Sequence, residues 1–191
     1  ELEMEKLHTA LPFLPATGTL SGELHEMHFS ENVIHATGTI RLNAFGGEMI
    51  VRDLMVKYPL TDQRLIGADI EIKKIDLQQL TRYFNFGTMT GTISGTMHGL
   101  QFCINPLGAQ APILPIRFDI DIHSDMEGNG SLNRDTLNQI VDLGQTSGLA
   151  ESMINREKYE YSELGLRADL NGDRFRINGT GENNYFISPA K

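Results

Sequence analysis

A thirteen-residue pattern occurs twice in this chain and constrains its fold more than any other feature. The stretch TGTLSGELHEMHF, residues 17–29, matches TGTISGTMHGLQF, residues 90–102, at seven positions. A fainter third copy, ATGTIRL, spans residues 36–42. Self-similarity of this kind is typical of a fold built from repeated units. We therefore expect the copies to be successive strands of one sheet, within repeat units near residues 17–86 and 90–180.

The glycines of the second copy recur every four residues, a spacing that fits either a helix interface or one face of a strand. The intervening residues are threonine and serine, which favour strand, and each glycine in a helix would cost about 1 kcal/mol relative to alanine. With the period of a strand, Ile93 and Met97 share one face with glycines. We expect this face to be a groove whose floor glycines admit a close approach: Gly18, Gly22, Gly38, Gly91 and Gly95.

The same alternation of apolar and polar residues continues elsewhere in the chain. It predicts strands over residues 34–42, 48–56, 66–73 and 116–123, the second of them following a Gly-Gly turn. Near the end of the chain, Asn171-Gly172 separates two further alternating runs and predicts a hairpin.

Helical patterns are confined to two places. Residues 76–84 form a short segment that begins with the capping residue Asp76, and residues 133–148 carry an apolar stripe ended by glycines. These helices are too short to cover the apolar face of so many strands. The expected fold is mainly β: a long, curved, antiparallel sheet, U-shaped with an open apolar groove, and two short helices covering part of the apolar face.

Composition excludes several classes of function. Sixteen basic against 25 acidic residues give a net charge of −9, and no basic stripe is present, so we expect no nucleic-acid partner.

The sequence contains no apolar run long enough to span a bilayer. Its one cysteine, Cys103, reads as a strand residue. Because the chain opens with Glu1 instead of methionine, we interpret it as a fragment of a larger protein.

No catalytic signature is present, and we expect neither enzymatic activity nor a cofactor. GxSxG, HExxH, CxxC and Walker A motifs are all absent from the sequence. His25, His28 and His35 change faces along their strands, so we predict no metal site there. Residues 125–130 lack the bidentate acid of a calcium loop and read as a solvated turn.

The remaining feature is an apolar face larger than its visible covering and rich in methionine. Methionine suits an apolar guest of imprecise shape. The alternative interpretation is that these residues form an ordinary core beneath the two helices.

Several of these motifs together resemble the carboxy-terminal region of the AsmA-like proteins, most closely the YdbH branch with its "dicarboxylate transport" domain label. They are G-T-L-S-G, F-G-G-E-M-I-V-R-D-L-M-V, D-I-E-I-K-K-I-D-L-Q-Q-L and F-G-T-M-T-G-T-I-S-G within residues 18–102. The closing E-Y-S-E-L-G-L-R-A-D-L-N-G-D-R-F-R-I-N-G-T, residues 160–180, resembles that family's final hairpin. The resemblance covers most of the chain and makes residues 1–191 a single β-rich segment.

The resemblance implies a non-enzymatic lipid conduit in a Gram-negative cell envelope. It places the protein in the periplasm, anchored in the inner membrane through a segment absent from this sequence. Its partners would be phospholipid or another acyl-chain lipid and an outer-membrane or periplasmic protein.

On this reading, acyl chains lie on the apolar face and headgroups stay in water. The predicted groove residues are Leu20, Leu24, Ile34, Ile40, Ile50, Leu54, Ile70, Ile72, Ile93, Met97, Ile120 and Leu166. The alternative function is a structural or interaction module of the cell envelope, with a closed core and an edge strand that pairs with a neighbour.

Overall fold

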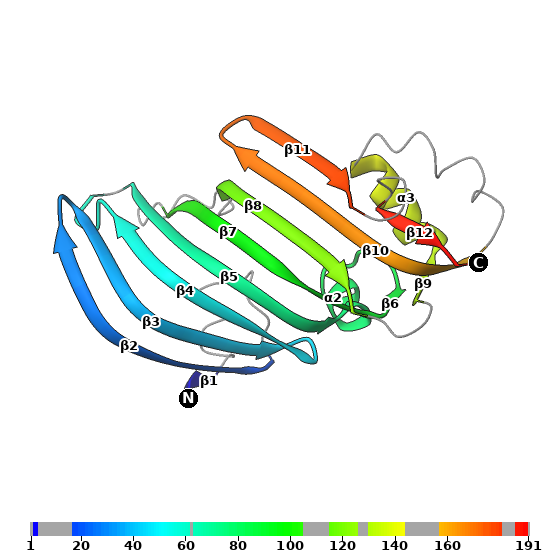
Figure 1. Ribbon diagram of the computed structural model, residues 1–191, viewed down its shortest axis with the longest axis horizontal. Helices are drawn as coiled ribbons and strands as arrows, with labels where there is room; N and C mark the ends of the chain where they lie inside the picture. The colour runs from blue at the N-terminus through cyan, green and yellow to red at the C-terminus, as the bar shows by residue number, and fades with distance from the viewer. Residues whose placement is uncertain are drawn as a thin grey trace.

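The computed structural model describes residues 2–3, 17–61, 63–104, 115–125, 130–143, 157–180 and 186–190. These residues form one antiparallel sheet of twelve strands and two helices (Figure 1). The sheet is curved and does not close on itself. The expected fold class is therefore confirmed.

The long strands lie side by side mostly in chain order. They are β2 (Thr19–Ser30), β3 (Val33–Ala44), β4 (Gly47–Lys57), β5 (Arg64–Asp76), β7 (Thr92–Ile104), β8 (Pro115–Ser124) and β10 (Lys158–Asn171). A two-residue strand, β1 (Leu2–Glu3), pairs with the start of β2 at one edge. At the other end of the sheet, β10 also pairs with β9 (Gly130–Asn133), β11 (Arg174–Gly179) and β12 (Ile187–Pro189), and β9 pairs with β6 (Met89–Thr90).

Both predicted helices are present in the described part of the chain. Helix α2 (Leu77–Tyr83) follows Asp76, whose carboxylate accepts hydrogen bonds from the N–H groups of Gln78 at 2.7 Å and Gln79 at 3.2 Å. Helix α3 (Arg134–Leu143) is shorter than the predicted range, and residues 144–148 of that range lie outside the described residues. The predicted hairpin joins β10 to β11, with Gly172 in its turn at φ +64°.

A row of β-bulges crosses the sheet at one level. Pairing shifts by one residue between β2 and β3 near Leu24, between β3 and β4 near Ala36, between β4 and β5 near Arg52, and on either side of β7 near His98. Each bulge bends its strand and increases the local twist. Because the bulges are aligned, the strands bend together, which accounts for the curvature seen in Figure 1.

The bulges also explain how one face stays apolar along strands whose sequence alternation changes phase. On β2 the apolar positions are Leu20 and Leu24 before the bulge but Met27 and Phe29 after it. The same change of phase occurs on β4, from Met49 and Val51 to Leu54 and Val56, and on β7, from Ile93 and Met97 to Leu100 and Phe102. An inserted residue shifts the period-two pattern, so the apolar side chains remain on one face.

Candidate functional site

Apolar residues lie in register across the sheet and form one continuous surface, which we call the apolar face. One row, near α2, is Leu20, Leu42, Met49, Ile72, Gly95, Ile122 and Leu166. A second row, beyond the bulges, is Phe29, Ile34, Val56, Ile66 and Phe102. Residues paired across an antiparallel ladder share a face, so these rows extend from edge strand β2 to β7 and β10.

All but one of the predicted groove residues lie on the apolar face: Leu20, Leu24, Ile34, Ile40, Leu54, Ile70, Ile72, Ile93, Met97, Ile120 and Leu166. Ile50 does not, because it is in register with Arg41 and Glu71 on the opposite face. Leu54 and Ile50 are four residues apart, but the bulge at Asp53, where φ is +52°, separates their faces. Ile50 is therefore removed from the groove.

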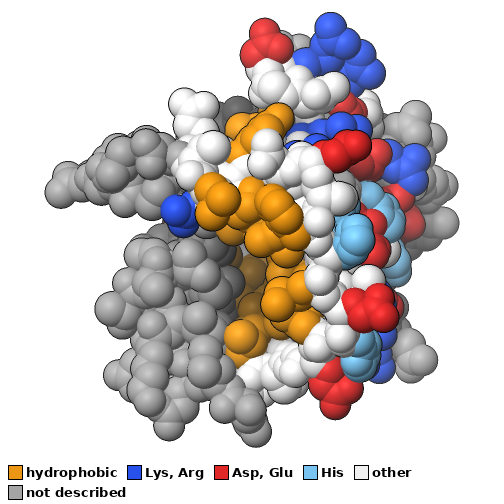
Figure 2. Space-filling model, turned by 90° about the vertical axis from the view of Figure 1, so that its left-hand side faces the viewer, with side chains coloured by type: hydrophobic (Ala, Val, Ile, Leu, Met, Phe, Trp, Pro, Cys, Tyr) orange, Lys and Arg blue, Asp and Glu red, His pale blue; other side chains and the backbone are white. Residues whose placement is uncertain are grey.

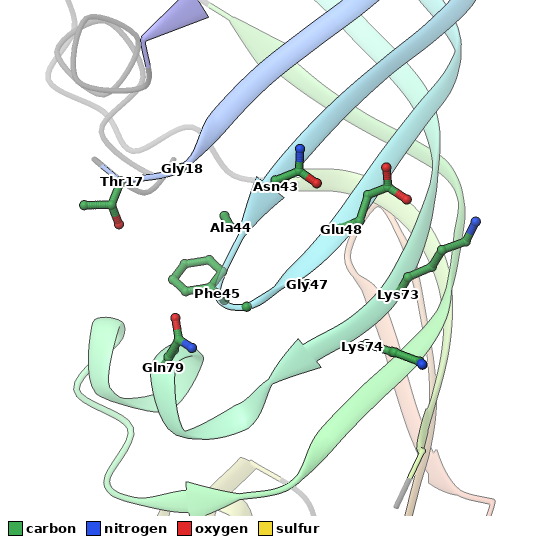
Figure 3. Close-up of a pocket in the computed structure, with 11 residues that line it drawn as sticks. Thr17, Gly18, Asn43, Ala44, Phe45, Gly47, Glu48, Lys73, Lys74 and Gln79 are labelled. Atoms are coloured by element: carbon green, nitrogen blue, oxygen red, sulfur yellow. The ribbon is translucent and has the colours of Figure 1, made fainter. Parts of the chain in front are cut away.

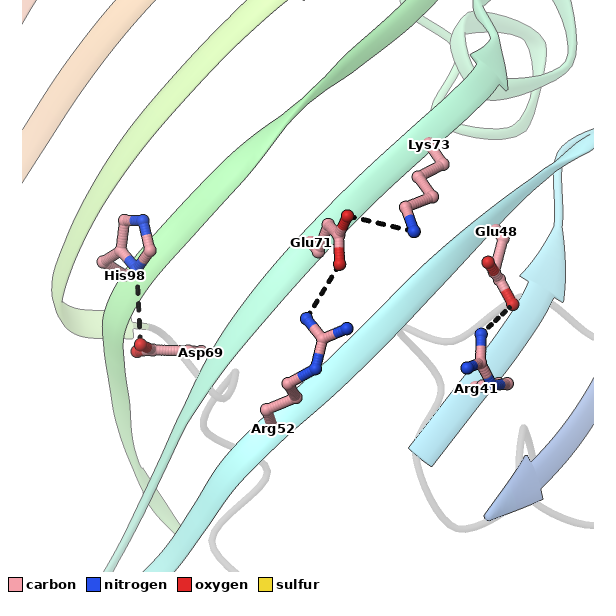
Figure 4. A network of polar contacts seen from close by, with 7 residues as sticks. All are labelled: Arg41, Glu48, Arg52, Asp69, Glu71, Lys73 and His98. Atoms are coloured by element: carbon pink, nitrogen blue, oxygen red, sulfur yellow. Dashed lines mark hydrogen bonds and ion pairs between the residues drawn. The ribbon is translucent and has the colours of Figure 1, made fainter. Parts of the chain in front are cut away.

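The face opposite the apolar face, the outer face, carries a ladder of ion pairs (Figure 4). Arg41 contacts Glu48 at 2.8 Å, and Glu71 accepts hydrogen bonds from Arg52 at 2.8 Å and contacts Lys73 at 3.0 Å. Hydrogen bonds from Arg52, then Lys73, hold the pKa of Glu71 below its usual value. Exposed pairs of this kind contribute little to stability, but they keep this side of the sheet hydrated. The outer face is therefore polar.

Burial along the apolar face divides it into a covered and an uncovered part. Near α2, Ile75, Leu77, Met89 and Ile93 are buried in the main hydrophobic cluster. Ile93 is only 5% exposed and is thus a core residue. The substitution Ile93→Asp would bury a charge and lower the stability of the fold, so it would not report on the binding of a guest. Part of the predicted groove is consequently ordinary core.

Away from α2 the same face is open to solvent. Met27 is 73% exposed, Phe29 57% and Leu24 47%. Ile70 and Met97 are only half-buried, although they lie on central strands. Figure 2 shows hydrophobic side chains gathered in a hollow at this end, with charged and histidine side chains beside them. In the described part of the chain, the main helix contacts are those of α2 with β5 and β6 and of α3 with β9.

The repeated sequence encodes a repeated backbone geometry. In each Thr-Gly-Thr copy the glycine has a positive φ: +130° at Gly18, +135° at Gly38 and +124° at Gly91. The two longer copies become β2 and β7, and both contain a bulge at the matching position, next to His25 and His98. The strands β3, β4 and β5 lie between β2 and β7, so the prediction that the copies are successive strands is wrong for the two longer copies. The similarity of these two copies reflects how a strand begins and where it bends.

At four of the five predicted floor glycines, the close approach is that of a neighbouring strand. A Cβ at Gly38 would collide with the carbonyl oxygen of Glu23 on the neighbouring strand. The nearest atoms to a Cβ at Gly18, Gly22 and Gly95 also belong to the adjacent strand. These glycines allow close backbone approach within the sheet, so they shape the groove without leaving a gap for a guest.

A pocket of about 620 Å³ surrounds the β3–β4 hairpin (Figure 3). Phe45 and Gln79 lie on one side of the hairpin, whereas the side chains of Lys73 and Lys74 extend away on the other. Because its charged groups do not converge on one point, we assign no chemistry to this pocket. The Gly-Gly turn was visible in the sequence, but the pocket depends on residues from four separate segments.

A second cavity, of about 240 Å³, lies between α2 and the sheet, and Ile93 and Leu166 are among the residues that line it. Sequence reasoning identified those two residues as part of an apolar face. It did not predict the cavity, because the cavity depends on how α2 sits on the sheet.

The structure also locates the histidines, the turn and the cysteine that the sequence analysis considered. His28 and His35 are exposed register partners, and within the described residues no three His, Cys, Asp or Glu side chains are grouped as metal ligands. Residues 126–129 of the predicted solvated turn lie outside the described residues. None of the described helices is both long and apolar enough to cross a bilayer. Cys103 is a half-buried strand residue on β7.

Comparison of the chain with protein-family models, with curated proteins and with solved structures gave no match. Function must therefore be inferred from the geometry of the sheet itself.

Proposed function

We propose that this chain is a non-enzymatic segment of a lipid conduit, carrying phospholipid acyl chains on its apolar face. The observation that carries the proposal is the continuity of that face: rows of apolar side chains in register cross the sheet, and one end of them is exposed. Soluble proteins rarely leave a contiguous apolar surface of this kind uncovered without a binding role.

The energetics suit a sliding apolar guest. Each methylene group removed from water contributes about 0.8 kcal/mol, and an apolar surface makes no directional bonds that would hold a chain at one position. Half-buried Met97 and exposed Met27 can adjust to the shape of a chain. The charged outer face would remain in water while lipid occupies the other side.

The proposed setting follows from the AsmA-like resemblance of the motifs. In that setting the segment lies in the periplasm, between the inner and outer membranes, as part of a longer protein anchored in the inner membrane. The proposal includes a docking partner in the outer membrane or periplasm.

A second candidate function, an interaction module, is favoured by one observation. Among the described residues, the outer edge of β2 pairs only with Leu2 and Glu3, opposite Leu20 and Thr19. Over the rest of β2, this edge has no strand partner in the described part of the chain, so another strand can add there. This function needs a closed core, whereas Ile70 and Met97 are only half-buried.

The experiment is lipid analysis of gently purified protein by native mass spectrometry and extraction, with two matched variants. Ile34 and His35 are neighbours on β3 with side chains on opposite faces. Ile34→Glu places a charge on the apolar face and should reduce bound phospholipid several-fold. His35→Glu places the same charge on the outer face and should leave it unchanged.

Circular dichroism of both variants establishes that each is folded. Folded protein that neither carries nor accepts phospholipid contradicts the proposal. A strand-forming partner captured by such lipid-free protein would support the interaction module in its place.

A further inference from the structure

The cavity beneath α2 is enclosed on two sides by apolar side chains. Its floor is the apolar face, with Ile122 on β8, Leu166 on β10 and Ile177 on β11. Its roof includes Leu77 and Leu80 of α2. A volume of about 240 Å³ is larger than the apolar cavities of about 150 Å³ that are known to bind small hydrocarbons.

The cavity offers water almost nothing to bind. Among the described residues that line it, only Thr81 has a polar side chain. The Thr81 hydroxyl already donates a hydrogen bond to the carbonyl of Leu77 at 2.7 Å and accepts one from the N–H of Met89 at 3.4 Å. An ordered water needs two to four polar partners, so this space is suited to an apolar guest.

The cavity floor continues into an exposed apolar strip. On β8, Ile120 and Phe118 follow from Ile122 on the same face, and Phe118 contacts Phe175 of β11 with ring centroids 6.4 Å apart. Phe175 is 50% exposed. At about 3.4 Å per residue, the distance along β8 from Ile122 on the cavity floor to Phe118 is about 14 Å.

We propose that the cavity holds the methyl end of an acyl chain whose remaining length lies along the strip formed by Phe118, Leu170 and Phe175. This inference depends on the proposed function, because it states where on the proposed lipid-binding face the methyl end of the acyl chain lies. The acyl chain then has its methyl end under α2 and its polar head directed toward exposed Phe175.

The test uses stearic acid carrying a nitroxide either near its methyl end or near its carboxylate, with the methyl groups of the protein observed by NMR. The methyl-end label should broaden the signals of Ile93, Ile122 and Leu166. The carboxylate-end label should broaden Leu170 more strongly than those three signals. Equal broadening by both labels, or the reverse pattern, would overturn the inference.

Two variants test the same point by filling space. Leu166 on β10 lines the cavity, whereas Leu65 on β5 is in register with Lys57 and Cys103 on the outer face. Leu166→Phe should weaken stearic acid binding several-fold, whereas Leu65→Phe, the same substitution away from the apolar face, should leave it nearly unchanged. If Leu166→Phe does not fold, the nitroxide experiment on the unmodified protein still decides the question.

The outcomes separate this inference from the proposed function. Lipid bound at the exposed end near Phe29, with the cavity methyl signals unaffected, would refute the cavity assignment and leave the conduit intact. Absence of lipid binding anywhere on the apolar face would refute both.

Discussion

The carboxylate of Asp69 on β5 accepts a hydrogen bond from the backbone N–H of Gly99 on β7, with an N···O distance of 2.7 Å. The other carboxylate oxygen lies 3.3 Å from Nδ1 of His98 (Figure 4). His98 and Gly99 form the β7 bulge, where Gly99 has φ +58°. One side chain therefore holds the bulge that keeps Met97 and Leu100 on the same face of the sheet.

Removing this carboxylate should destabilise the bulge. Asp69→Ala leaves the Gly99 N–H without its charged acceptor, and we expect a loss of about 1.5–3 kcal/mol in the free energy of unfolding. Urea denaturation measures this loss. The matched control is Asp119→Ala on the same face, which should change the free energy of unfolding by less than about 1 kcal/mol, because Asp119 is exposed and is in register with the like charge of Asp169 as well as with His98. Equal losses in the two variants would contradict the role assigned to Asp69.

The repeated glycines should differ in their tolerance of a side chain. At Gly38, alanine would have both an unfavourable φ of +135° and a collision with the Glu23 carbonyl, so we expect a loss above about 2 kcal/mol. At Gly99, alanine meets nothing within 4 Å and has only an unfavourable φ, so about 1 kcal/mol should be lost. Thermal denaturation of Gly38→Ala and Gly99→Ala compares them. A larger loss at Gly99 would contradict the close strand approach.

The core beneath α3 should respond to high pH through Tyr161. This residue is fully buried, its hydroxyl donates to the carbonyl of Thr90 at 2.7 Å, and burial raises its pKa to about 12. The usual tyrosine pKa is about 10. Because the pKa of Tyr161 is higher in the folded protein than in the unfolded chain, the contribution of Tyr161 to stability is full below about pH 10 and is lost as the pH rises toward 12.

The variant Tyr161→Phe should therefore weaken the fall of the melting temperature between pH 10 and 12. At neutral pH it should cost about 1 kcal/mol, because the Thr90 carbonyl loses its partner. Tyr58→Phe, at an exposed residue, is the control and should change neither quantity. An unchanged pH dependence in Tyr161→Phe would show that other groups determine it.

Local patterns in the sequence predict much of this fold. Period-two alternation identifies the strands, Asp76 marks the start of α2, and Asn171-Gly172 marks the last hairpin. These features depend on residues close in sequence, so they can be recognised without knowing which strands pair.

The error at Ile50 shows what local patterns miss. Asp53 and Lys74 adopt positive φ although neither is glycine, and these bulge positions have no strong sequence signal of their own. The only trace is a change of phase, such as that from Leu20 and Leu24 to Met27 and Phe29. The cavity under α2 is also hidden, because it depends on tertiary packing.

Site-specific photocrosslinking on β2 tests the central claim, that lipid lies on the apolar face. Phe29 and His28 are adjacent, both exposed, and on opposite faces. A photoreactive phenylalanine analogue replaces each in turn, and the protein is irradiated with phospholipid vesicles. We predict lipid adducts from position 29 and few or none from position 28. Equal yields at both positions, or no adducts at position 29 in folded protein, would contradict the account.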